Sequence, residues 1–201
     1  MSRRPAAPCA AAPASNSADT GPSTRMVWVE PLTNPSLHLH DLSQVAALCK
    51  ARGIISVADS TFCTPCLTRP LEHGIDLVMH SMTKYLGGHG DATGGLVAGA
   101  EPLVRAIRQT GLGQVGGNLA PQEAFLFLRG IKTLPLRMAA HCDGALAVAQ
   151  FLAQHAAVSV THYPGLSNHP QHALAKRQMQ GGYGGMVSFE LAGGSRAEAA
   201  A

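Results

Sequence analysis

Residues 80–90 of the chain read His80-Ser81-Met82-Thr83-Lys84-Tyr85-Leu86-Gly87-Gly88-His89-Gly90. The stretch directly follows the apolar run Ile75–Met79, which is typical of a buried strand. This order places Lys84 just past the carboxyl end of a strand, in a turn rich in glycine. Burial at such a position disfavours a charged ammonium group, so the sequence predicts that the neutral, nucleophilic amine of Lys84 is accessible near neutral pH.

Two more strands are predicted upstream, at Met26–Val29 and Ile54–Ala58, from their β-branched and apolar runs. Between them, residues 42–52 repeat apolar side chains at helical spacing. Asp41 fits the N-cap of that helix, and Gly53 fits the position that ends it. Strand, helix and strand in this order predict a right-handed crossover unit of a parallel sheet.

Polar side chains follow the end of each predicted strand. Asn34 comes after the first strand, Asp59 after the second and Lys84 after the third. In open α/β sheets, ligands bind outside the carboxyl ends of the strands. The topology therefore predicts that these three side chains face one crevice.

The remaining chain predicts helices that cover the sheet and then a second, smaller unit. The patterns indicate a helical turn near residues 69–74, a strand at 95–98, helices at 102–109, 121–129 and 136–155, a strand at 158–162, a helix at 171–178 and a strand at 186–191. Residues 1–25 are rich in Ala, Pro, Ser and Gly and are predicted to be a disordered leader. We expect a partial large α/β domain over residues 26–157 and the beginning of a small α+β domain over residues 158–201.

Composition narrows the class of protein. Of 201 residues, 46% are hydrophobic and 13% are charged, and the net charge of +3 forms no basic stripe, which disfavours a nucleic-acid partner. No apolar run approaches the roughly 20 residues that a membrane helix needs. Five cysteines without framework spacing favour reduced thiols and a cytoplasmic location.

The residues around Lys84 suggest a cofactor. Ser81 and Thr83 place hydroxyl groups on both sides of the lysine, where they could donate to a phosphate. Asp59 could face a ring nitrogen, supported by Thr61, and the Asn34 amide could reach a ring oxygen. A lysine for a Schiff base, phosphate donors and a carboxylate are what pyridoxal 5′-phosphate requires, so this cofactor is predicted.

Other readings of the same residues stay open at this point. Lys84 could be a surface lysine, and Asp59 and Asn34 could be turn residues. Cys63-Thr64-Pro65-Cys66 resembles a thioredoxin-like dithiol, although the sequence runs on into Pro70 rather than into an evident helix. Ten histidines invite a metal site, but no carboxylate accompanies them at ligand spacing, and no metal is predicted.

Five segments in order resemble the Cys/Met metabolism family of pyridoxal-phosphate enzymes, which perform trans-sulfuration. The segments are Glu30–Pro35, Ala58–Phe62, His80–His89, Arg129–Met138 and Tyr163–His172. The resemblance covers Met26–Leu191 and implies the large domain of the type I aminotransferase-like fold. It also implies γ-elimination on a sulfur amino acid such as methionine or cystathionine, with γ-replacement as the alternative outcome.

The resemblance implies a role for each site residue. Lys84 would bind the cofactor covalently and move substrate protons, and Asp59 would pair with the ring nitrogen. Ser81 and Thr83 would bind the phosphate, Thr61 would support the ring, and Asn34 would contact the ring hydroxyl. Family members are expected to be cytoplasmic homo-oligomers, dimers of dimers, that act on small molecules.

Some positions depart from the family pattern. Pro31-Leu32 stands where a hydroxyl residue and then proline are usual, and Ser60 replaces a common asparagine. The family also has an upstream region with further cofactor contacts, and a downstream arginine for the substrate carboxylate. We therefore also expect, as a hypothesis of another class, a non-catalytic fragment that only binds the cofactor or associates with related subunits.

Overall fold

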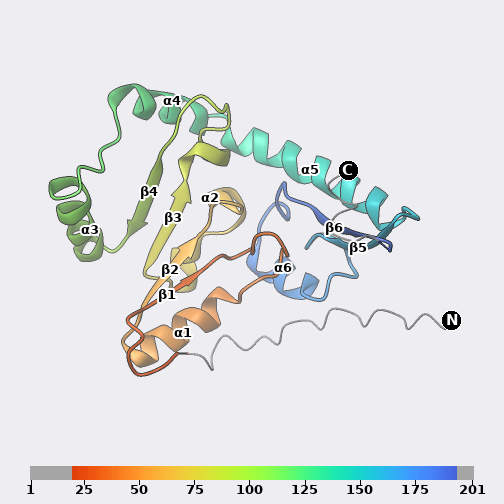
Figure 1. Cartoon of the computed structure of the whole chain (residues 1–201), viewed down its shortest axis with the longest axis horizontal. Helices are drawn as coiled ribbons and strands as arrows, with labels where there is room; N and C mark the ends of the chain where they lie inside the picture. The colour runs from red at the N-terminus through yellow and green to blue at the C-terminus, as the bar shows by residue number, and fades with distance from the viewer. Residues whose placement is uncertain (1–19, 194–201) are drawn as a thin grey trace.

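The computed structural model describes residues 20–193, and Figure 1 shows their arrangement. Most of the predicted leader, residues 1–19, lies outside the described residues, as do residues 194–201 of the predicted small domain. Residues 20–25 lead through a turn into the first strand, and the Arg52 guanidinium donates to the Thr20 carbonyl at 3.2 Å.

A four-stranded sheet forms the centre of the molecule, in the order β1-β2-β3-β4. Its strands are β1 (Met26–Val29), β2 (Ile55–Asp59), β3 (Leu77–Ser81) and β4 (Gly95–Gly99). The first three strands run parallel, and β4 pairs antiparallel with β3. The prediction of a mostly parallel sheet flanked by helices is confirmed, and the carboxyl ends of β1, β2 and β3 meet at one edge.

Helix α1 (Leu42–Arg52) makes the crossover between β1 and β2, with the bounds that the sequence predicts. The Asp41 carboxylate accepts the Gln44 amide at 3.1 Å, and Gly53 takes a φ of 63°, so both predicted caps are confirmed. The buried side of the helix includes Leu42 and Cys49, which pack with the apolar residues of β1 and β2. This packing fixes the sheet edge on which the polar residues lie.

Strand β3 begins two residues later than the apolar run predicts. The Asp76 carboxylate accepts both the backbone amide and the hydroxyl of Ser56, at 2.8 and 2.7 Å. The Ser56 hydroxyl also accepts the Asp76 amide at 3.0 Å. At this position, hydrogen bonds of the two side chains therefore replace the backbone hydrogen bonds between β2 and β3. The strand then continues to Ser81, which moves its polar end closer to Lys84 than the prediction of Ile75–Met79 allows.

One short helix, over residues 64–67, is not predicted from the sequence, and the others differ from their predicted bounds by a few residues. These helices are α2 (Thr64–Leu67), a 3₁₀ turn η1 (Pro70–His73), α3 (Glu101–Gly113), α4 (Pro121–Ile131), α5 (Leu134–Ala153) and α6 (His172–Gln178). Strands β5 (Val158–His162) and β6 (Ser188–Leu191) form a separate antiparallel pair. Figure 1 shows this pair beside the far part of α5, away from the four-stranded sheet.

A buried cluster joins the beginning and the end of the described chain. It packs the loop after β1 against α2, α5 and α6, through Leu32, Leu37, Leu67, Met138 and Ala175 among others. The Gln171 side chain closes the contact, because it accepts the Leu39 amide and donates to the Leu39 carbonyl, each at 2.7 Å. Within residues 20–193, no helix is long and apolar enough to cross a bilayer.

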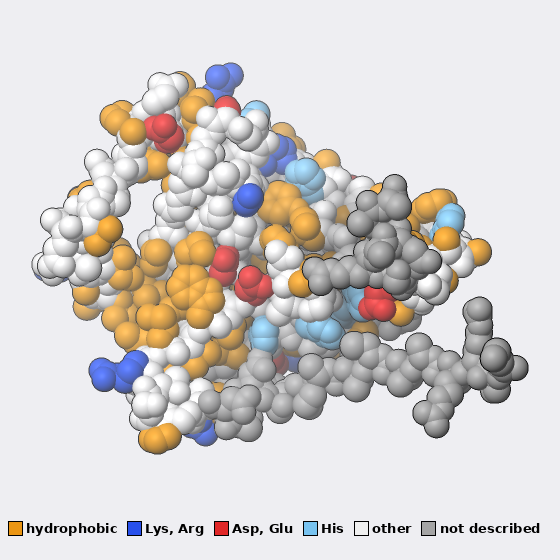
Figure 2. Space-filling model, in the orientation of Figure 1, with side chains coloured by type: hydrophobic (Ala, Val, Ile, Leu, Met, Phe, Trp, Pro, Cys, Tyr) orange, Lys and Arg blue, Asp and Glu red, His pale blue; other side chains and the backbone are white. Residues whose placement is uncertain are grey.

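One face of the sheet stays open at its first strand. Val27 and Val29 of β1 pack toward α1, so Met26 and Trp28 point to the opposite face. Met26 is 50% exposed and Trp28 is 53% exposed. Figure 2 shows hydrophobic side chains gathered on the visible surface over the sheet.

Because of the buried histidine His169, we expect the free energy of unfolding to fall at acidic pH. His169 accepts the Gln171 amide on Nδ1 at 3.2 Å. Burial lowers its pKa from 6.5 to about 4, with further lowering by the charges of His38, His162 and His172. The unfolded chain therefore takes up a proton as the pH falls below 6.5, whereas the folded chain does so only near pH 4.

The expected result is a loss of about 2 to 3 kcal/mol of unfolding free energy between pH 7.5 and pH 4. Urea unfolding at both pH values measures it. The loss should shrink in His169→Gln and persist in His155→Gln, a substitution at an exposed histidine. An equal loss in both variants would assign the acid sensitivity to other groups.

Candidate active site

A connected hydrogen-bond network lies at the carboxyl ends of β2 and β3. Asp59 Oδ1 accepts the Thr61 amide at 3.0 Å and the Thr61 hydroxyl at 2.5 Å. The same hydroxyl accepts the Ser81 amide at 2.8 Å. Thr61 thus orients Asp59 and joins it to the residue three positions before Lys84. Within the described residues, Asp59 Oδ2 makes no hydrogen bond, so this oxygen can accept one from a ligand.

Lys84 lies in a helical turn, η2 (Met82–Leu86), which the sequence predicts only as a glycine-rich loop. The Met82 carbonyl accepts the Gly87 amide, and the Lys84 carbonyl accepts the Gly88 amide, both at 2.8 Å. Lys84 itself departs from helical geometry, with φ −88° and ψ −122°. Gly88 follows with a φ of 75°, which favours glycine and lets the chain leave the turn.

The Lys84 side chain is exposed, which corrects one prediction. The sequence places the amine at the end of a buried strand and predicts its desolvation there. In the structure β3 ends at Ser81, and the turn carries Lys84 beyond the sheet to the surface. The predicted burial of this side chain is therefore wrong for the described residues.

The other predicted site residues differ in their surroundings. The Thr83 hydroxyl accepts the Gly94 amide at 3.0 Å and donates to the Gly94 carbonyl at 3.3 Å. Among the described residues, the Ser81 hydroxyl makes no hydrogen bond. Asn34 is exposed in the loop after β1, and its backbone amide donates to Glu30 Oε2 at 2.8 Å. The structure thus joins Asp59, Thr61 and Ser81 directly, and no hydrogen bond links Asn34 to them.

A buried histidine lies beneath this network. His80 is 5% exposed on β3, and burial lowers its pKa, while the charge of Asp59 and a hydrogen bond to the Ser60 backbone act in the opposite direction. Its Nδ1 is buried without a hydrogen-bond partner in the described part of the chain. Burial thus favours the neutral form of the His80 imidazole. The sequence alone shows His80 only as one of several scattered histidines.

The dithiol alternative is not supported by the state of its first cysteine. A short helix, α2, does begin directly after Cys63, which the sequence interpretation had not expected. Burial nevertheless raises the Cys63 pKa to about 12; a hydrogen bond with Thr68 opposes this rise, and the charge of Asp59 adds to it. The thiol stays protonated near neutral pH, whereas a redox-active cysteine of this type reacts as the thiolate.

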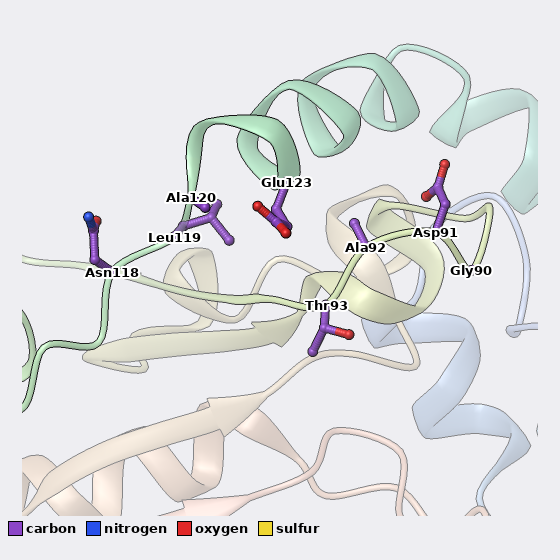
Figure 3. A pocket seen from close by; sticks show the side chains of 8 residues that line it. All are labelled: Gly90, Asp91, Ala92, Thr93, Asn118, Leu119, Ala120 and Glu123. Carbon is purple, nitrogen blue, oxygen red and sulfur yellow. The ribbon is translucent and has the colours of Figure 1, made fainter.

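Neither a metal site nor the hollow beside α4 involves the predicted site residues among residues 20–193. Within residues 20–193, no group of three His, Cys, Asp or Glu side chains has the arrangement of a metal site. A hollow of about 510 Å³ lies between the loop after Gly90 and the start of α4. Figure 3 shows the Glu123 carboxylate pointing from α4 toward the loop that carries Ala92. None of the predicted site residues lines this hollow.

The glycine-rich sequence after Lys84 packs against α4 and α5. Met82 and Leu86 form a buried cluster with Phe127 of α4. Gly130 of α4 approaches the turn so closely that a Cβ there would lie 2.2 Å from the Gly87 carbonyl oxygen. Arg137 of α5 donates to the Tyr85 carbonyl at 2.7 Å. The turn that presents Lys84 is thus held by the Arg129–Met138 segment.

Comparison with known proteins gives one family for the chain. The family model of the Cys/Met metabolism PLP-dependent enzymes matches residues 10–201. The chain belongs to this family. It is 50% identical over 174 residues to an L-methionine gamma-lyase of Pseudomonas putida, covering 86% of this chain and 44% of that protein. A cystathionine beta-lyase of Coxiella burnetii is 47% identical over 169 residues, covering 84% of this chain and 43% of that protein.

Solved structures of the family share the fold. The crystal structure of cystathionine gamma-lyase from Lactobacillus plantarum complexed with L-serine superposes with a TM-score of 0.83 at 41% identity. The match covers 88% of this chain and 46% of that one. The chain thus spans a little under half the length of these relatives. The predicted family, fold class and cofactor are confirmed.

Proposed function

We propose that this chain carries the lysine-bearing half of a pyridoxal-phosphate site for the breakdown or exchange of carbon–sulfur bonds in amino acids. The hydrogen-bond network of Asp59, Thr61 and Ser81, next to the turn of Lys84, carries the proposal. The family match supports the cofactor, and the network supplies a fixed carboxylate with one oxygen available.

The residues present fit the cofactor. Asp59 Oδ2 would accept the proton of the ring nitrogen, while Oδ1 stays fixed by Thr61. The Ser81 hydroxyl would donate to the phosphate, and the Thr83 hydroxyl could join it by exchanging its long 3.3 Å bond to Gly94. Lys84 would bind the cofactor covalently, and Asn34 would contact the ring hydroxyl from the loop after β1.

The proposed chemistry divides between the cofactor and the chain. When bound, pyridoxal phosphate supplies an electron sink that stabilises negative charge beside the amino group of the substrate. Asp59 keeps the ring nitrogen protonated. Once the substrate amine has displaced it from the cofactor, Lys84 Nζ would take the proton from the substrate α carbon and pass it to the cofactor; it would then take a proton from the β carbon and give it to the sulfur that leaves the γ carbon as a thiol.

We propose the substrate class from the names of the relatives, and the location and assembly from the resemblance to the family alone. Methionine or cystathionine would undergo γ-elimination, and γ-replacement by an incoming nucleophile is the alternative. We propose a homo-oligomer in the cytoplasm, a dimer of dimers, that contributes further residues to each site. We also propose that residues 26–157 are part of a cofactor-binding domain and that residues 158–201 begin a smaller one.

The test uses the purified chain with added pyridoxal phosphate. The expected result is the yellow absorbance of a lysine-bound cofactor, with an adduct at Lys84 after borohydride reduction and peptide mass mapping. L-methionine and L-cystathionine are then supplied, and released thiol and 2-oxo acid are measured. A chain without an adduct at Lys84 would overturn the cofactor proposal.

A second candidate is a non-catalytic, cofactor-binding fragment. One observation favours it: the Lys84 side chain is exposed among the described residues. An adduct at Lys84 without thiol release is the result that this candidate predicts.

A further inference from the structure

Arg137 makes four hydrogen bonds, two of them to the turn that presents Lys84. Its Nη1 donates to the Tyr85 carbonyl at 2.7 Å, and its Nη2 lies 3.4 Å from the Leu86 carbonyl. The same Nη2 donates to the Gly130 carbonyl of α4 at 2.9 Å. Nε donates to the Thr133 hydroxyl at 3.1 Å. The guanidinium thus ties the turn, the end of α4 and the start of α5 together.

These acceptors need a donor from outside the turn. Carbonyls at the end of a helical turn have no following helical amide to accept from, and arginine side chains can take that place. The chain leaves the turn at Gly88, and the guanidinium lies directly against it: a Cβ at Gly88 would be 2.1 Å from Arg137 Nη1. The glycine is therefore needed for the close approach as well as for its positive φ.

The guanidinium can influence the direction of the Lys84 side chain because it binds the same short turn. Only a short turn separates Ser81, which belongs to the Asp59 network, from the carbonyls that Arg137 binds. Lys84 itself has backbone angles outside the helical region. Hydrogen bonds on both sides of Lys84 therefore set the direction in which its side chain leaves the turn.

We propose that Arg137 is a positioning residue: by binding the carbonyls of Tyr85 and Leu86, it fixes the backbone of the turn and so the direction in which the Lys84 side chain leaves it. The planar, forked guanidinium is suited to this task, because it reaches acceptors on two elements at once. The inference rests on the proposed function for the role of Lys84, but the ordering of the turn is measurable without the cofactor.

The experiment compares Arg137→Gln and Arg137→Lys with wild type and with Arg129→Gln, a matched change at an exposed arginine on α4. Amide hydrogen exchange of the chain without cofactor is followed by mass spectrometry for residues 82–90 and, as a fold control, for residues 42–52. We expect exchange over residues 82–90 to rise at least about tenfold in Arg137→Gln, since hydrogen bonds from a charged donor are lost. Residues 42–52 and the Arg129→Gln variant should match wild type.

The second readout is the rate at which borohydride traps pyridoxal phosphate at Lys84. We expect it to fall roughly tenfold in Arg137→Gln, as the turn loses its orientation. Wild-type exchange over residues 82–90 in Arg137→Gln would overturn the inference. If that variant loses protection over residues 42–52 as well, Arg137→Lys decides: faster exchange confined to residues 82–90 supports the inference, and wild-type exchange overturns it. Failure of the wild-type chain to form the adduct would count against the proposed function alone.

Discussion

Replacing Lys84 by alanine should remove all cofactor adduct at position 84. The chain contains four lysines, Lys50, Lys84, Lys132 and Lys176, any of which can react with a free aldehyde at the surface. Of the four, only Lys84 lies directly after the Asp59 network, whose carboxylate and hydroxyl groups are proposed to hold the ring and the phosphate. Borohydride trapping at low cofactor concentration, followed by peptide mapping, measures the adduct at each lysine.

Lys132→Ala is the matched control, since Lys132 is also exposed and lies in the turn after α4. It should leave the Lys84 adduct and the yellow absorbance unchanged. Because the Lys84 side chain is exposed, Lys84→Ala should change the unfolding free energy by no more than about 0.5 kcal/mol. A similar amount of adduct at all four lysines of the wild-type chain would show that the site has no preference for Lys84.

The substitution Gly130→Ala should destabilise the fold by about 2 kcal/mol or more, even though alanine is the better helix former. The added Cβ would lie 2.2 Å from the Gly87 carbonyl oxygen and 3.0 Å from its carbon, and both atoms are backbone. Backbone atoms cannot rotate away, so α4 must shift from the turn that carries Lys84. Urea unfolding measures the loss, and the Lys84 adduct should decrease with it.

Gly144→Ala provides a control of opposite sign. Gly144 is exposed in the middle of α5, and a Cβ there would meet nothing within 4 Å. Alanine should therefore stabilise the chain by about 0.5 to 1 kcal/mol through helix propensity alone. Equal effects of the two substitutions would show that α4 does not press against the lysine turn.

Local patterns predicted the elements that depend on local rules. Asp41 and Gly53 define α1 because a capping carboxylate and a left-handed glycine act on the few residues beside them. The strand Val158–His162 has its predicted bounds for a similar reason, since three of its five residues, Val158, Val160 and Thr161, are β-branched. Asp59, Thr61 and Ser81 could be placed at one edge because parallel strands bring their carboxyl ends together.

The predictions from sequence were wrong where the structure depends on contacts between residues far apart in the chain. The start of β3 depends on the pairing of Asp76 with Ser56, which lies twenty positions away in the sequence. The exposure of Lys84 depends on a helical turn whose glycines contact Phe127 and Arg137 on two later helices. The sequence alone shows Arg137 only as part of a segment that resembles the family. Nothing in the neighbouring residues relates its guanidinium to carbonyls more than fifty positions earlier.

The open face of β1 gives the chain an optical property. Trp28 is the single tryptophan of the sequence, and about half of its side chain is in water, at one border of the four-stranded sheet. The intrinsic fluorescence of the protein therefore comes from one known place, distant in sequence from the lysine turn. Its emission wavelength reports whether that border of the sheet is wet or covered.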